Sequence, residues 1–261
     1  MKTLLLALLM VALSGAAPLF AQNPPPPTAP ADVKPPPPPQ DPDIAAKKNG
    51  KDGQPDNGFL KQHESFVQIA KGGDVDLLFV GDSITAGWRG QKEIWQKAFG
   101  AYKPANFGIG GDRTQHILWR LENGELDGIS TKVAVLMIGT NNSNSDSAEG
   151  IAAGIKKIVE TIHAKSTKTK VLLLAVFPRG EKPNPQRDKL KQVNSIISKL
   201  DNGKDVFYLD IGEKFLEPDG SLTKEIMPDF VHLSAKGYQI WADATASKLV
   251  DLMKWEYDRI K

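Results

Sequence analysis

Two polar residues near the C-terminal end of the chain have the types and spacing of an acid–base pair. The segment MPDFVHLSAKGY places Asp229 three residues before His232, one of four histidines in the sequence. A buried carboxylate can fix the tautomer of an imidazole and stabilise its protonated form, as a general base in nucleophilic catalysis requires. An aspartate near a helix start can also serve only as an N-cap. The pair therefore indicates catalysis only together with other polar groups.

Three such groups follow apolar runs of the sequence. GDSIT follows VDLLFV, GIGGD follows PANF, and GTNN follows VAVLMI. Continuous apolar runs separated by amphipathic stretches predict a parallel sheet covered by helices on both faces. Ligands of such sheets bind outside the carboxyl ends of the strands. Each motif alone could be a cap or a turn, but together with Asp229 and His232 they predict one active site on this rim.

The elements that must position these motifs can be read from the same pattern. Strands are expected over 75–80, 104–107, 133–138, 171–176 and 206–210. Helices are expected over about 94–99, 114–121, 148–164, 185–200 and 234–257. The last of these helices should close the domain.

Composition excludes several classes of function. The 261 residues carry a net charge of +2, and Lys and Arg are spread along the chain. One sizeable α/β core is therefore expected, and no nucleic-acid partner. The absence of cysteine excludes disulfides, thiolate metal sites, a cysteine nucleophile and a lipid-modified cysteine.

The N-terminal residues have the pattern of an export signal followed by a spacer. Residues 1–21 combine a basic start, a short apolar run and small residues before a cut near Ala21, which predicts a cleaved signal peptide. The proline-rich residues 22–56 are expected to form an extended spacer. The folded domain should then span 57–261, secreted or periplasmic, with no transmembrane segment after cleavage.

Other chemistries find little support in the sequence. GDSITAGWRGQK lacks P-loop spacing, GIGGD does not fit G-x-G-x-x-G, and GDSIT does not fit G-x-S-x-G. No pair of histidines has the spacing of metal ligands, so neither a metal nor a cofactor is expected. His63 and His163 are expected on helix surfaces and His116 on a helix face.

Two further groups leave alternatives open. Trp88, Trp95 and Trp119 could pack in the core or line a groove for sugars. Arg179 follows a strand on the same rim, where it could contact a substrate or form a structural salt bridge in the loop.

Taken in order, GDSIT, NFGIGGD, GTNN and DFVHLS resemble the conserved blocks of the SGNH or GDSL hydrolases. The longer stretch NFGIGGDRTQHILWRLENGEL and the segment FPRG resemble one branch, the catalytic subunits of intracellular platelet-activating-factor acetylhydrolase. The resemblance runs from about Leu77 to the last helix and leaves out the first 56 or so residues. It implies a flavodoxin-like three-layer α/β/α fold with a parallel five-stranded sheet, and it is compatible with a homodimer.

The same resemblance implies a role for individual residues. Ser83 would be the nucleophile, His232 the general base and Asp229 the residue that orients it. The oxyanion hole would consist of the backbone N–H groups of Ser83 and Gly111 and the side-chain amide of Asn141.

The resemblance also implies a small acyl pocket, walled by Ile84 and Val231, although both could simply pack into the core. We therefore expect a secreted serine esterase that hydrolyses short-acyl esters, with O-acetyl groups on carbohydrates as the first substrate class. Acetylated lipids are the alternative substrate. A carbohydrate- or envelope-binding module without activity is the alternative function.

Overall fold

The computed structural model describes residues 40–50 and 52–254. Internal contacts divide the chain into residues 1–36, none of which is described, and residues 37–261, which form the unit discussed below. The signal peptide predicted over 1–21 lies outside the described residues, as do positions 255–257 of the last expected helix.

Five parallel strands form the centre of this unit. They are β1 (Leu77–Gly81), β2 (Pro104–Gly108), β3 (Val133–Met137), β4 (Lys170–Leu174) and β5 (Val206–Leu209). Their order in the sheet is β2-β1-β3-β4-β5, so the chain reverses direction across the sheet between β2 and β3. Val80 of β1 pairs with Phe107 of β2 on one side and with Leu136 of β3 on the other. The predicted α/β fold with a parallel five-stranded sheet is confirmed.

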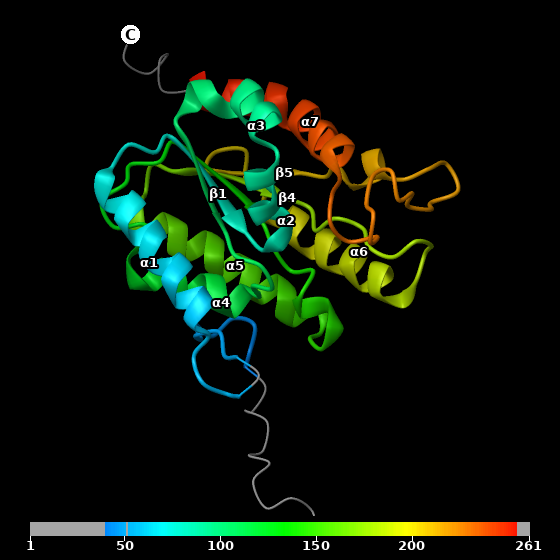
Figure 1. Cartoon of the computed structure of the whole chain (residues 1–261), viewed down its shortest axis with the longest axis horizontal. Helices are drawn as coiled ribbons and strands as arrows, with labels where there is room; N and C mark the ends of the chain where they lie inside the picture. Colours follow the sequence, from blue (N-terminus) through cyan, green and yellow to red (C-terminus); the bar gives the residue numbers. More distant parts are fainter. Residues whose placement is uncertain (1–39, 51, 255–261) are drawn as a thin grey trace, which may run out of the picture. The chain divides into compact units, whose positions relative to one another are not determined.

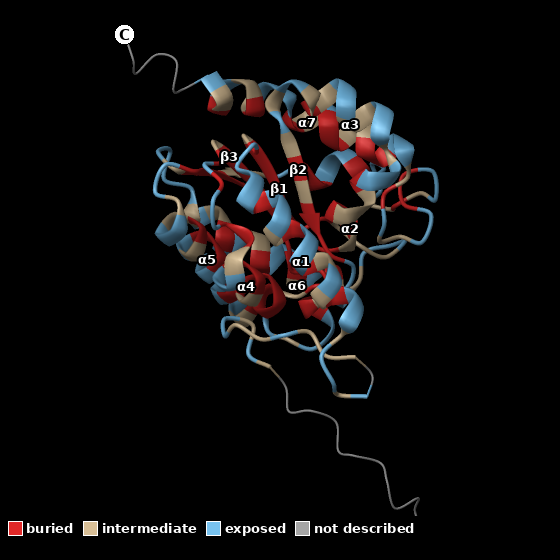
Figure 2. Cartoon of the chain, turned by 60° about the vertical axis from the view of Figure 1, so that its left-hand side comes forward, coloured by how far each residue is buried: buried red, intermediate tan, exposed pale blue. Residues whose placement is uncertain are grey.

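Helices cover both faces of the sheet (Figure 1). One face packs against α1 (Asn57–Gly72), α4 (Thr114–Arg120), α5 (Ala148–Lys165) and α6 (Pro185–Ile197). The other face packs against α3 (Lys92–Phe99) and α7 (Ala235–Lys254), and the short helix α2 (Ser83–Ala86) follows β1. Figure 2 shows the buried strands between the two helical layers. Successive residues of β1 alternate between the layers, since Leu78 and Val80 face the first and Leu77 and Phe79 the second.

Helix α1 was not among the ranges expected for helices, although His63 was expected on a helix surface. Its buried positions are Phe59, His63, Phe66 and Ala70, at helical spacing on one face. A histidine and an alanine occupy two of these four positions, so the apolar stripe is weak in the sequence. The helix begins after Asp56, whose side chain accepts a hydrogen bond from the N–H of Phe59 at 3.0 Å.

The second layer is rich in aromatic side chains. Trp88 is 1% exposed and lies 5.3 Å from both the Phe99 and Trp241 rings, centroid to centroid. Trp95 is partly buried against Phe79, at 4.8 Å. Large buried rings of this kind dominate core energetics. Trp88 therefore belongs to the core, and Trp95 packs at the edge of the same core cluster.

Residues 40–50 and 52–56 pack on the domain, which differs from the extended spacer expected up to residue 56. The Ala46 N–H donates to the Gln115 carbonyl at 3.0 Å, and the Thr114 hydroxyl donates to the Pro42 carbonyl at 2.7 Å. An antiparallel bridge joins Asn49 and Pro55. Prolines are sparse in this part of the segment, so its backbone groups are free to pair with the first turn of α4. Within the described part of the chain, no helix has the length and apolarity needed to cross a bilayer.

Candidate active site

Ser83 lies at a tight turn between a buried strand and a helix. Strand β1 ends at Gly81, Asp82 caps α2, and Ser83 is the first residue of that helix. The Asp82 Oδ1 accepts a hydrogen bond from the Ile84 N–H at 2.9 Å. Helix α2 packs directly on β2, because a Cβ at Gly108 would lie 2.3 Å from the Ala86 nitrogen. This packing holds Ser83, partly exposed, at the carboxyl end of β1.

Asp229 and His232 occupy a loop that Asp229 organises itself. The Asp229 Oδ1 accepts hydrogen bonds from the N–H groups of Val231 at 3.0 Å and His232 at 2.7 Å. Its Oδ2 lies 2.6 Å from the His232 Nδ1. Phe230, between them, has a φ of 59°, a conformation that costs a non-glycine residue about 1–2 kcal/mol. Strain of this kind persists only where surrounding contacts over-determine the backbone.

The Ser83 hydroxyl completes a chain of hydrogen bonds with this loop. Its Oγ lies 2.8 Å from the His232 Nε2, although the two residues are 149 positions apart in the sequence. Since Asp229 is ionised, the His232 Nδ1 carries a proton toward it, and Nε2 is left as the acceptor for the Ser83 proton. The Tyr238 hydroxyl of α7 donates to the Ile84 carbonyl at 2.6 Å and thereby ties α7, which follows the loop, to α2.

The Asp229 carboxylate is exposed, as is the His232 ring that it contacts. The Asp229 side chain is 57% exposed and that of His232 48%. Desolvation alone would raise the pKa of Asp229. Hydrogen bonds from the His232 ring and from the backbone N–H groups of His232 and Val231 outweigh it and lower the pKa to about 2. Asp229 therefore acts through hydrogen bonds and remains a carboxylate above about pH 2.

The loop between β2 and α4 runs beside Ser83. A Cβ at Gly110 would lie 3.9 Å from the Ser83 Cβ, and Gly111 has a φ of 73°, which favours glycine. The Asn141 Nδ2 donates to the Asp112 carbonyl at 2.8 Å, and this leaves its second N–H available. Arg179 donates to the carbonyl of Thr140 at 3.1 Å and to its hydroxyl at 3.2 Å, so it holds the residue before Asn141. These contacts of Arg179 are structural, but they are hydrogen bonds and not the salt bridge named as the alternative to a substrate contact.

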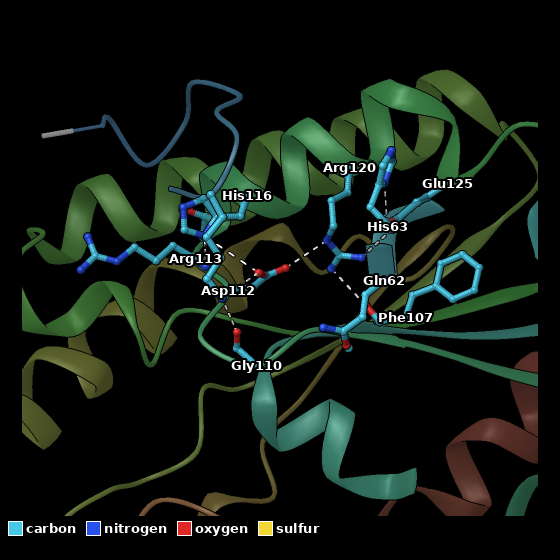
Figure 3. A network of polar contacts seen from close by, with 12 residues as sticks. Gln62, His63, Phe107, Gly110, Asp112, Arg113, His116, Arg120 and Glu125 are labelled. Atoms are coloured by element: carbon cyan, nitrogen blue, oxygen red, sulfur yellow. Dashed lines mark hydrogen bonds and ion pairs between the residues drawn. The ribbon is translucent and has the colours of Figure 1, made fainter. Parts of the chain in front are cut away.

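Behind this loop lies a buried ionic network that sequence reasoning missed (Figure 3). The Arg120 Nε lies 3.0 Å from the Asp112 Oδ2, and its Nη1 lies 2.6 Å from the Glu125 Oε2, with all three side chains fully buried. Glu125 also contacts the His63 Nδ1 at 2.9 Å. The expectation of a surface His63 was therefore wrong: the residue is 7% exposed, because it lies on the inner face of α1.

The other two histidines differ from each other. His116 is buried and accepts a hydrogen bond from the Arg113 N–H at 3.1 Å. Burial, with the nearby charges of Lys48, Arg113 and Arg120, lowers the pKa of His116 to about 3, so this ring stays neutral. His163 is partly buried on α5 rather than fully exposed. Among the described residues, no three acidic or histidine side chains gather where they could hold a metal ion.

The two residues proposed for an acyl pocket lie in different surroundings. Ile84 is 2% exposed and belongs to the core cluster that contains Trp88 and Trp241. Val231 is partly exposed in the loop between Asp229 and His232. Because so little of Ile84 reaches the surface, the core alternative describes Ile84.

Asp82 gives the fold a pH dependence. Its Oδ2 is buried without a hydrogen-bond partner among the described residues, and burial raises its pKa to about 7. A carboxyl whose pKa is raised on folding favours the folded state at low pH. That contribution is lost between pH ~3.9, where the unfolded chain ionises, and about 7.

We therefore expect Asp82→Asn to stabilise the protein at pH 8 by about 1–3 kcal/mol and to leave it unchanged near pH 4. The asparagine oxygen can still accept from the Ile84 N–H. Urea unfolding from pH 4 to 8 measures the difference, with the exposed Asp43→Asn as the control. A difference that does not grow with pH would show that Asp82 is ionised throughout.

Comparison with known proteins identifies the family of the chain. Residues 79–240 match the GDSL-like Lipase/Acylhydrolase family. The chain belongs to this family. Platelet-activating factor acetylhydrolase IB subunit alpha2 of Homo sapiens is 43% identical over 189 residues, which cover 72% of this chain and 82% of that protein. Subunit alpha1 of Homo sapiens is 39% identical over 204 residues, or 78% of this chain and 87% of that protein.

Solved structures share the fold at lower identity. A GDSL-like lipase from Bacteroides thetaiotaomicron matches with a TM-score of 0.62 and 19% identity, over 74% of this chain and 97% of that chain. A carbohydrate acetylesterase from Sinorhizobium meliloti matches with a TM-score of 0.51 and 19% identity, over 68% of this chain and 99% of that chain. The family membership and the acetylhydrolase relatives identify the chain as a carboxylic ester hydrolase.

Proposed function

We propose that Ser83, His232 and Asp229 are the catalytic residues of a short-acyl esterase. The observation that carries this proposal is the continuous hydrogen-bond chain from the Ser83 Oγ through His232 to Asp229. The Ser83 Oγ attacks the ester carbonyl as its proton passes to the His232 Nε2. The imidazolium then returns the proton to the departing alcohol, which leaves an acyl-enzyme on Ser83. Water, activated by the same imidazole, releases the carboxylic acid.

The oxyanion of each tetrahedral intermediate needs donors that are already in place. We assign them to the N–H groups of Ser83 and Gly111 and to the free amide hydrogen of Asn141. The first N–H groups of a helix have no partner within it, which suits Ser83 at the start of α2. Asn141 is held by Asp112 on one side and through Thr140 by Arg179. Donors fixed in this way stabilise charge without reorganising during the reaction.

The acyl group is proposed to be acetyl. Relatives 43% identical to this chain are named acetylhydrolases, and the partly exposed Val231 directly precedes His232 in the loop. The leaving alcohol is proposed to be a carbohydrate or another small alcohol. An acetylated lipid is the second candidate, because the same relatives are named for platelet-activating factor. Export, predicted from residues 1–21, would bring such an enzyme to extracellular acetylated polymers.

Hydrolysis of p-nitrophenyl acetate tests the reaction, and acetate release tests the alcohol. We expect turnover of p-nitrophenyl acetate that exceeds that of the octanoate ester. Acetylated xylan and an acetylated phospholipid, compared at equal acetyl concentration, separate the two substrate classes. A folded wild-type protein without turnover on any of these esters would favour a binding module and overturn the proposal.

Val231 offers a test of acyl selectivity. If its side chain limits the acyl site, Val231→Ala should raise kcat/KM for the butyrate ester relative to acetate about tenfold, the scale of one or two methylenes. Leu216→Ala is the control, because this partly buried residue lies outside the catalytic loop and packs against the core layer of Trp88 and Trp241. An unchanged chain-length profile in a folded Val231→Ala variant would remove Val231 from the acyl site.

A further inference from the structure

Lys48 reaches from the N-terminal segment to the loop beside the nucleophile. Its Nζ donates a hydrogen bond to the Gly110 carbonyl, 62 positions along the chain. The Lys48 side chain is only 19% exposed. Its backbone is held as well, because its carbonyl accepts from the Asp56 N–H at 2.9 Å, directly before α1. The backbone that carries Lys48 is thus held before it, by the Ala46 N–H on the Gln115 carbonyl, and after it, by the Asp56 N–H.

The accepting carbonyl belongs to the same peptide unit as the Gly111 N–H. A peptide unit is planar and trans, so the C=O of Gly110 and the N–H of Gly111 point in opposite directions. Fixing the carbonyl therefore fixes the direction of the N–H that we assign to the oxyanion. The Asp112 N–H donates to the Ile109 carbonyl at 3.2 Å and closes a turn around this unit. Neither flanking residue has a Cβ, so the unit can still rotate within that turn. A charged donor on the carbonyl also polarises the unit and strengthens its N–H as a donor.

We propose that Lys48 is a positioning residue that holds the Gly110–Gly111 peptide with its N–H directed at the oxyanion. This inference rests on the proposed function of Ser83 and Gly111. It assigns a part in the reaction to residues 40–50, which would otherwise serve only to cover α4.

The alternative is that Lys48 serves only to neutralise Asp112. Its Nζ lies 3.8 Å from the Asp112 Oδ1, whereas the Arg120 Nε lies 3.0 Å from the Oδ2 of the same carboxylate. Asp112 therefore keeps a nearer and fully buried cation when Lys48 is replaced. The Gly110 carbonyl accepts its hydrogen bond from Lys48, so removing the ammonium acts first on the peptide unit.

Kinetics of Lys48→Met test the proposal, because methionine keeps the length of the side chain and removes the donor. We expect kcat for p-nitrophenyl acetate to fall roughly 10- to 50-fold with little change in KM, less than the ~100- to 1,000-fold lost with an oxyanion donor itself. The inhibition constant of a boronic acid, whose adduct on Ser83 is tetrahedral and anionic, should rise by a similar factor. Lys48→Arg, which restores a charged donor, should recover most of the activity.

Lys47→Met is the matched control. Lys47 is the exposed neighbouring cation, with its Nζ 5.1 Å from the centre of the Trp119 ring. We expect its kcat to stay close to that of the wild type. The proposal is overturned if Lys48→Met keeps the wild-type kcat, if its loss lies in KM alone, or if Lys47→Met loses as much.

A second measurement keeps the inference separate from the esterase proposal. In the Ser83→Ala background, with glycine labelled with nitrogen-15, Lys48→Met should shift the amide resonance of Gly111 more than that of the distant Gly203. An unchanged Gly111 resonance overturns the positioning role even if the enzyme is an esterase. A shifted resonance in a protein without esterase activity would instead support the contact and overturn only the proposed function.

Discussion

Replacing Ser83 with alanine should lower kcat/KM for p-nitrophenyl acetate by about a millionfold, the scale found where a comparable triad has been dissected. The variant has no nucleophile to form the acyl-enzyme, and the His232 Nε2 loses the hydroxyl that lies 2.8 Å from it. The fold should be unaffected, because Ser83 is partly exposed and its hydroxyl contacts the His232 ring. Initial rates with an excess of variant, compared with the buffer rate, measure the loss.

Two further variants make this result specific. His232→Ala should be nearly as severe, and the double variant Ser83→Ala with His232→Ala should be no worse than either alone, because the two residues act as a unit. Ser195→Ala, at an exposed position of α6, is the control for loss of a hydroxyl. Ordinary turnover by Ser83→Ala would refute the proposed mechanism, and additive losses would show that Ser83 and His232 act in separate steps.

The sheet could be predicted because its strands are buried on both faces. All five residues of β1, β3 and β4 are buried, so each reads as a continuous apolar run. Parallel strands end at the same rim, and this places GDSIT, GIGGD and GTNN together without any knowledge of side-chain contacts. The contact between Ser83 and His232 could be predicted for the same reason, although the two residues are 149 positions apart in the sequence.

The parts that could not be predicted depend on contacts between polar groups distant in the sequence. His63 was expected at the surface because its buried partner, Glu125, lies 62 positions away. No residue close to His63 in the sequence indicates this contact. The same separation hides the contact between Lys48 and Gly110. Asp229 illustrates the opposite case, since spacing alone placed it beside His232 but did not reveal that its side chain is 57% exposed.

The buried network behind the active-site loop should carry much of the stability of this layer. We expect Arg120→Met to lower the free energy of unfolding at pH 8 by about 3–5 kcal/mol, the usual cost of removing one partner of a buried ion pair. Asp112 and Glu125, both fully buried, would lose the guanidinium that lies between them. The Phe107 carbonyl would also lose its hydrogen bond from the Arg120 Nη2, at 3.0 Å. Urea unfolding measures the change, and Lys156→Met, which removes an exposed pair with Glu160, should cost less than ~1 kcal/mol.

The pH dependence of the stability lost in Arg120→Met shows whether the loss comes from leaving the Asp112 charge without its cation or from lost packing. Burial raises the pKa of Asp112 to about 7 even with Arg120 present, and removing the cation should raise it further. A carboxyl with a raised pKa favours the folded state at low pH and loses that contribution as the pH rises. The defect of Arg120→Met should therefore be smaller at pH 5 than at pH 8, and adding Asp112→Asn should recover part of it at pH 8. A defect equal at both pH values and unmoved by Asp112→Asn would mean that Arg120 stabilises the fold by packing and not by its charge.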